Sequence, residues 1–239
     1  MAQPPLLRRA AAEAFAVFAL VFAGCGAIIA NTEYDGALGV QGITFTFGLT
    51  IMAMIYATGH LSGAHINPAV TIAFTLTRHF PVRDAFAYIP AQLVGATGAA
   101  GVLYAAWPDK PANLGATVPS VGAWQAFLYE ALLTTLLMFT IMAVATDARA
   151  VGASAAIAIG AVIALDGLFG GPVTGASMNP ARSFGPALVS GEWQDFWVYA
   201  LAPPVGALVG ALAYQFVRGG PEQSNPVRES LTSAGRRVP

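Results

Sequence analysis

Charged side chains are scarce in this chain of 239 residues. Asp, Glu, Lys and Arg make up 10% of it, against roughly a quarter in soluble domains. The formal net charge is −1, so nothing indicates a nucleic-acid partner. The single cysteine, Cys25, excludes an intrachain disulfide. Only three histidines are present, and we expect neither a metal nor a cofactor.

Long apolar runs dominate what is there, because 56% of the residues are hydrophobic. A bilayer-spanning helix needs about 20 mostly apolar residues. Gly and Ala are dense in every run of that length, as expected where helices pack closely in lipid. The sequence predicts an all-α membrane protein whose six transmembrane helices cover about 10–30, 38–59, 84–106, 122–145, 152–170 and 195–217. A signal peptide after Arg8-Arg9 is disfavoured, because that run is too long and five more follow it.

Basic residues set the expected orientation. An even number of spans places both termini on one side of the membrane, and that side carries nearly all of the basic residues: Arg8, Arg9, Arg78, Arg83, Arg149, Arg218, Arg228, Arg236 and Arg237. The other side has only Lys110. Positive charge favours the cytoplasm, so we expect cytoplasmic termini. The chain is then one membrane domain over 1–218, with a polar, disordered cytoplasmic tail over 219–239.

The tripeptide Asn-Pro-Ala occurs twice, as Asn67-Pro68-Ala69 and Asn179-Pro180-Ala181. The two Asn residues stand 179 − 67 = 112 positions apart, each after a small-residue loop between the second and third spans of its half. One copy alone would be an ordinary helix start. Two equivalent copies predict a repeat, about 10–106 and 122–217, whose halves are inverted because three spans is an odd number.

A short helix is predicted after each Asn, at Val70–Thr77 and Arg182–Val189. Proline suits the first helical position. About 10 residues give a length of about 15 Å, half of a roughly 30 Å hydrocarbon core. Two such half-helices meeting head to head would bring their positive N-terminal ends together. Asn67 and Asn179 would cap them and still offer amide donors. Such a centre would hold a neutral oxygen and repel cations, including hydronium.

Two further features accompany these motifs: Gly59-His60-Leu61-Ser62-Gly63-Ala64-His65 precedes the first motif, and Arg182 directly follows the second. With them, the chain from about Ala10 to Arg218 resembles the major intrinsic protein family of aquaporins and aquaglyceroporins. The resemblance implies the aquaporin fold, with six tilted helices and two half-helices in an inverted 3+3 repeat. It also implies one pore per subunit, a homotetramer and a place in the lipid bilayer of the plasma (inner) membrane.

The family's narrow filter uses four positions, which the motifs place here at Phe47, Gly167, Ala176 and Arg182. Strict water channels carry His where this chain has Gly167. Glycerol channels carry a bulky aromatic where it has Ala176. A wide filter with one aromatic wall and one fixed cation is therefore expected. Such a filter would pass water and small neutral solutes rich in hydroxyl groups.

Other segments divide between branches of the family. Ser183, next to Arg182, and Phe196-Trp197 are similar to water channels, whereas 171–178 and 113–117 resemble the nodulin-26-like branch and its bacterial relatives. That branch implies glycerol-like polyols, urea and undissociated metalloid hydroxides such as arsenous acid as cargo. The alternatives are a strict water-selective aquaporin and an ion-coupled secondary transporter. No nucleophile with a base, metal set or phosphate loop is visible, so we expect no enzyme.

Buried acids and the filter arginine each have a structural and a functional interpretation. We expect Glu13 and Glu130 to accept backbone N–H groups of the two inserted loops rather than to carry ions. Arg182 is a functional candidate at membrane depth, oriented by loop carbonyls. Asp166 either faces an interhelical gap with hydroxyl or backbone donors, or reaches the space that Gly167 leaves and alters solute choice.

The histidines and the cysteine have weaker signals. His60 and His65 are expected to hold loop backbone or line the cytoplasmic vestibule, since a metal site would need a third ligand. Cys25 is expected to serve packing. The mercury-reactive cysteine of some relatives stands at the position of Ala176, so we predict weak block by mercurials.

Overall fold

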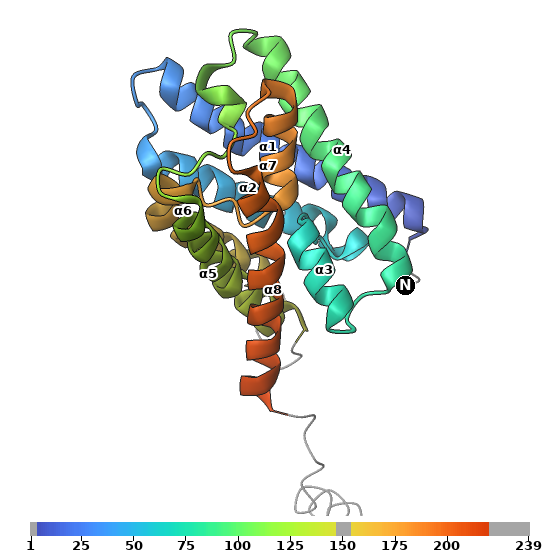
Figure 1. The fold of residues 1–239 in the computed structure, drawn as a ribbon. Helices are drawn as coiled ribbons and strands as arrows, with labels where there is room; N and C mark the ends of the chain where they lie inside the picture. Colours follow the sequence, from blue (N-terminus) through green and yellow to red (C-terminus); the bar gives the residue numbers. More distant parts are fainter. Residues whose placement is uncertain (1–3, 147–153, 220–239) are drawn as a thin grey trace, which may run out of the picture.

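The chain folds into a bundle of helices in the computed structural model, which describes residues 4–146 and 154–219 (Figure 1). The elements in this described part are α1 (Leu6–Glu33), α2 (Gly39–Ser62), α3 (Pro68–Leu76), α4 (Val82–Ala106), η1 (Pro111–Gly115), α5 (Ala123–Ile141), η2 (Met142–Thr146), α6 (Ala155–Thr174), α7 (Pro180–Ser190) and α8 (Phe196–Arg218). The predicted all-α fold is confirmed. Nearly all of the predicted tail, 220–239, lies outside the described residues.

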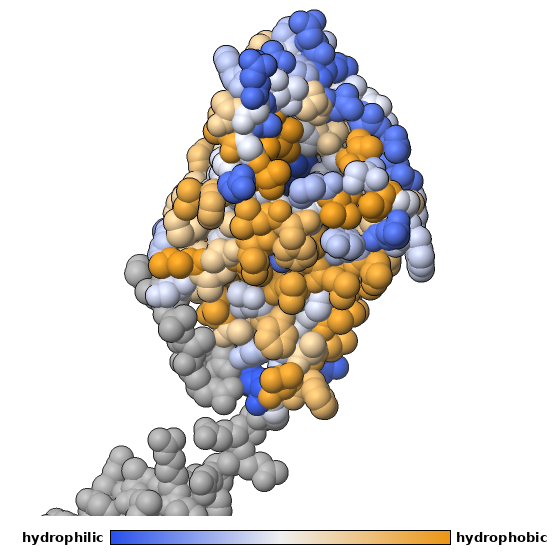
Figure 2. Space-filling view, turned by 90° about the vertical axis from the view of Figure 1, so that its left-hand side faces the viewer, coloured by the Kyte–Doolittle hydropathy of each residue, from blue (hydrophilic) through white to orange (hydrophobic). Residues whose placement is uncertain are grey.

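Six of the helices are long and apolar enough to cross a membrane: α1, α2, α4, α5 with η2, α6 and α8. They coincide with the six predicted spans, although the first two residues of the predicted span 152–170 lie outside the described part. Orange apolar side chains cover the middle of the face in Figure 2, whereas blue side chains gather toward its upper end. Exposed tryptophans stand where two of these helices begin, Trp124 in α5 and Trp193 and Trp197 at α8. Tryptophans at the ends of apolar spans are typical of a multi-pass membrane protein.

The two halves repeat the same helix contacts. In the first half α1 packs on α4, and in the second α5 packs on α8. Gly95 of α4 lies so close to the carbonyl oxygen of Ala14 that a Cβ there would overlap it. Gly206 of α8 has the same relation to Ala131. Because 206 − 95 = 111, this contact recurs almost at the spacing of the Asn-Pro-Ala motifs.

The two halves join where α2 crosses α6. A Cβ at Gly48 would lie 2.5 Å from the carbonyl oxygen of Gly160, and one at Gly160 would lie 2.6 Å from that of Gly48. Small residues let the two backbones approach this closely in lipid. The crossing brings side chains of α2 and α6 close together.

The short helices α3 and α7 begin at Pro68 and Pro180, two residues before the predicted Val70 and Arg182. Asn67 and Asn179 are their N-caps, so each Pro takes the first helical position, where no N–H is needed. With 9 and 11 residues they span about half of the hydrocarbon core. They are the predicted half-helices.

Candidate pore

Two loops with the same backbone conformation precede the half-helices, over 63–67 and 175–179. Three of the five positions in each loop have positive φ, at Gly63, Ala64 and Ile66 in one and at Gly175, Ala176 and Met178 in the other. Residues with a Cβ avoid this region, so tertiary contacts must hold them there. The loops therefore repeat in conformation, not only in sequence.

Glu13 of α1 holds the first loop. Its carboxylate accepts hydrogen bonds from the backbone N–H groups of His65 (2.9 Å) and Ile66 (2.7 Å). The hydroxyl of Ser62 (2.7 Å) and the side-chain amide of Gln92 (2.9 Å) also donate to it. These contacts are those expected of a structural acceptor.

Glu130 of α5 holds the second loop in the same way. It accepts from the N–H groups of Ser177 (2.9 Å) and Met178 (2.8 Å) and from the hydroxyl of Thr174 (2.7 Å). The partner corresponding to Gln92 is missing, because Pro203 stands 203 − 92 = 111 residues later. Both carboxylates are fully buried.

Further hydrogen bonds that we did not predict close the ends of α2 and α6. The hydroxyl of Tyr88 donates to the carbonyl oxygen of Ser62 (2.8 Å). That of Tyr199 donates to the carbonyl oxygen of Thr174 (2.6 Å). The two tyrosines stand 199 − 88 = 111 residues apart, so the repeat spacing was the signal that would have found them.

The structure does not give His60 the predicted role in supporting the loop. Its side chain is exposed and makes no hydrogen bond within the described part of the chain. His65 instead lies among aromatic rings, 4.5 Å from Phe80 and 5.0 Å from Phe74 between ring centroids. Its Nδ1 lies 3.1 Å from the hydroxyl of Thr71. The exposure of His60 at the end of α2 is a feature that similarity of motif cannot reveal.

The two Asn side chains hold each other's loops. The Oδ1 of Asn67 accepts from the N–H of Ala69 (2.8 Å), and its amide donates to the carbonyl oxygen of Met178 (2.7 Å). The Oδ1 of Asn179 accepts from the N–H of Ala181 (3.0 Å), and its amide donates to the carbonyl oxygen of Ile66 (2.8 Å). An amide carries two N–H groups, so each Asn keeps one for another acceptor. This reciprocal contact was not predicted.

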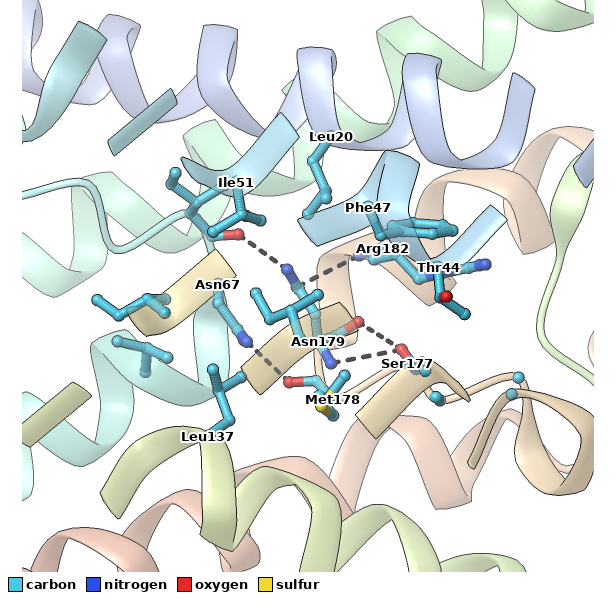
Figure 3. A pocket seen from close by; sticks show the side chains of 18 of the residues that line it. Leu20, Thr44, Phe47, Ile51, Asn67, Leu137, Ser177, Met178, Asn179 and Arg182 are labelled. Atoms are coloured by element: carbon cyan, nitrogen blue, oxygen red, sulfur yellow. Dashed lines mark hydrogen bonds between the residues drawn. The ribbon is translucent and has the colours of Figure 1, made fainter. Parts of the chain in front are cut away.

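A cavity of about 430 Å³ lies against both loops. Part of its lining is polar and comes from the loops, the two Asn residues and Arg182, which Figure 3 labels. Another part is apolar and includes Ile51, Ile55, Leu137, Ile159 and Ile163. Within the described residues no group of three metal-ligating side chains comes together. The cavity suits a small neutral molecule with a polar and an apolar face.

Phe47, Gly167, Ala176 and Arg182 all line this one cavity, as the predicted filter requires. Arg182 is buried, and its guanidinium donates to the carbonyl oxygen of Gly115 in η1 (2.7 Å). It also lies 5.0 Å from the centre of the Phe47 ring. In the described ranges the ion pair found is Arg9–Asp84, so Arg182 has no acidic partner there. Its charge therefore faces the cavity.

Asp166 is buried beside Gly167 but is not part of the cavity lining. Neither of its carboxylate oxygens has a hydrogen-bond partner among the described residues. The predicted hydroxyl or backbone donors are therefore not found. One turn later on the same helix, Gly170 lies against Leu133 of α5, so the side of α6 that carries Asp166 is turned toward α5, the helix that also carries the buried Glu130.

Sequence comparison identifies the family. Residues 1–214 match the family described as Major intrinsic protein. The chain belongs to this family. It is 46% identical to Nodulin-26 of Glycine max over 96% of this chain and 84% of that protein. It is 45% identical to Aquaporin NIP1-1 of Oryza sativa subsp. japonica over 97% of this chain and 80% of that one.

A solved structure agrees with this assignment. The X-ray structure of the aquaglyceroporin from Plasmodium falciparum matches with a TM-score of 0.81 and 27% identity, covering 94% of this chain and 99% of that one. The family consists of channels rather than enzymes. The chain is a passive membrane channel for water and small solutes.

Proposed function

We propose that this channel conducts small neutral solutes together with water: glycerol-like polyols, urea and undissociated metalloid hydroxides such as arsenous acid. The observation that carries the proposal is the filter itself. Phe47 and Arg182 stand on its wall, while Gly167 and Ala176 place nothing larger than a methyl group there. The similarity to an aquaglyceroporin of known structure supports a channel that is not limited to water.

The polar groups on the cavity wall explain how such a solute would pass while ions are excluded. Arg182 and the free amide N–H groups of Asn67 and Asn179 donate to the oxygens of the solute, and the isoleucines of the lining contact its carbon atoms. The N-termini of α3 and α7 add partial positive charge at the same place. A cation or hydronium would meet this field without a carboxylate to compensate it.

A strict water channel is the second candidate. It is favoured by Thr44 of α2, which lies where a side chain at Gly167 would project. Ion-coupled transport has less support, because Glu13 and Glu130 are already occupied by their donors. We further propose a homotetramer in the plasma membrane with cytoplasmic termini, residues 1–218 as one channel domain, and no enzymatic activity.

Swelling of proteoliposomes tests the proposal. Vesicles containing the protein should shrink quickly in a sucrose gradient and then re-swell with glycerol, urea or arsenous acid, each faster than empty vesicles. The rates should not depend on a proton gradient. Fast shrinkage with no re-swelling in any of these solutes would leave the strict water channel as the function.

A further inference from the structure

Gly167 does not leave an open space beside the cavity. A Cβ built on it would lie 2.7 Å from the Cγ2 methyl of Thr44 and 3.0 Å from its Cβ, closer than carbon atoms pack. Thr44 lies one helical turn before Gly48, where α2 crosses α6 at Gly160. The close crossing of the two backbones therefore places Thr44 of one half where a larger residue on α6 would project.

Thr44 belongs to the cavity wall and is held in place. It lines the cavity together with Phe47, which follows three residues later on the same helix, and Figure 3 labels both among the lining residues with Arg182. Its side chain is buried, and its hydroxyl donates to the carbonyl oxygen of Gln41 (3.1 Å). This bond fixes the side chain and leaves the methyl group against Gly167.

We infer that Thr44 is a specificity-determining residue, a fifth filter residue that takes the place of the side chain missing at Gly167 and sets the upper size of the solutes that pass. This inference rests on the proposed function, because it concerns solutes larger than water. Gly167 then serves two purposes: it adds no side chain of its own and it makes room for Thr44. Thr44 should therefore slow the permeation of a four-carbon polyol more than that of glycerol.

Substitutions at Thr44 test the inference in proteoliposomes. Thr44→Ala removes the methyl and hydroxyl groups and should raise the erythritol-to-water permeability ratio by at least about threefold. Thr44→Val keeps the size of the side chain and should leave the ratio within about twofold. Thr46→Ala is the matched control, because its hydroxyl donates to Gly42 on the same helix and it does not line the cavity.

A double substitution tests the contact itself. Gly167→Ala alone should lower solute flux, because its Cβ would overlap Thr44, and Thr44→Gly in the same chain should restore that flux. Water flux in the same vesicles shows that each variant is folded. The inference would be overturned if Thr44→Ala and Thr46→Ala had equal erythritol-to-water permeability ratios. It would also be overturned if this ratio were as high in Thr44→Val as in Thr44→Ala.

A different observation would show that the proposed function itself is wrong. Wild-type vesicles would then exclude glycerol and urea while water passes. A gain of glycerol flux in Thr44→Ala would in that case still support Thr44 as the wall that sets solute size.

Discussion

Gly24 and Cys25 of α1 lie far in sequence from both Asn-Pro-Ala motifs, yet they support both partners of Arg182. The ring of Phe47 covers Gly24 so closely that a Cβ there would overlap it. The carbonyl oxygen of Gly115 accepts the hydrogen bond from Arg182, and Gly115 has positive φ. A Cβ built on Gly115 would lie 2.8 Å from the Cβ of Cys25. The position of the filter cation thus depends on small residues in α1.

Gly24→Ala should therefore narrow the pore. The added methyl group forces the Phe47 ring away from α1 and toward Arg182, so we expect water and glycerol permeability to fall several-fold. Stopped-flow light scattering on proteoliposomes measures both. Gly26→Ala is the control, because its Cβ would have only an ordinary contact, 3.6 Å from a Leu103 methyl group. Equal permeabilities of the two variants would show that Gly24 does not position the ring.

Asp166→Asn should stabilise the protein without changing solute choice. A buried carboxylate without a partner costs about 1–3 kcal/mol or more, and the uncharged amide costs less. We expect a higher Tm in detergent and an unchanged glycerol-to-water permeability ratio, since Asp166 does not line the cavity. Glu130→Gln is the contrasting control and should lower the Tm, because that carboxylate accepts three hydrogen bonds. A shifted ratio in Asp166→Asn would place Asp166 in the filter.

At the scale of the elements, the apolar runs and the Asn-Pro helix starts predicted most of the fold. The six spans follow from the length of the apolar runs, since a bilayer requires about 20 apolar residues whatever surrounds them. The half-helices follow from Asn-Pro, where a cap precedes a residue that needs no N–H. Helix ends were less predictable: α1 continues to Glu33, beyond the apolar run, because local hydrogen bonds rather than hydropathy end a helix.

The pattern of residues along the sequence could not show the contacts between elements. The amides of Asn67 and Asn179 bond to carbonyls 111 and 113 residues away. The carbonyl that holds Arg182 belongs to η1, where Ala112, Asn113 and Leu114 have positive φ without being glycine. Counting back from each Asn located Phe47 and Gly167, but not Thr44, because its place depends on how α2 crosses α6.

The whole molecule offers a direct test of orientation. Cys25 is fully buried, so the protein has little background reactivity toward thiol reagents. Asp109 and Arg83 are exposed in the segments that precede η1 and begin α4. If the termini are cytoplasmic, a membrane-impermeant maleimide should label Asp109→Cys in intact cells and Arg83→Cys only after permeabilisation. The reverse pattern would place the termini outside.

The crossed hydrogen bonds of the two Asn residues also bear on biosynthesis. When Asn67 is synthesised, the carbonyl that its amide needs is still 111 residues from being made. At roughly 5–20 residues per second, the first loop waits several seconds or longer for its partner. The first half can insert its helices in that time, but its loop stays incomplete. The centre of the pore is therefore among the last parts of the chain to mature, and a nascent chain stopped before Met178 contains only half of it.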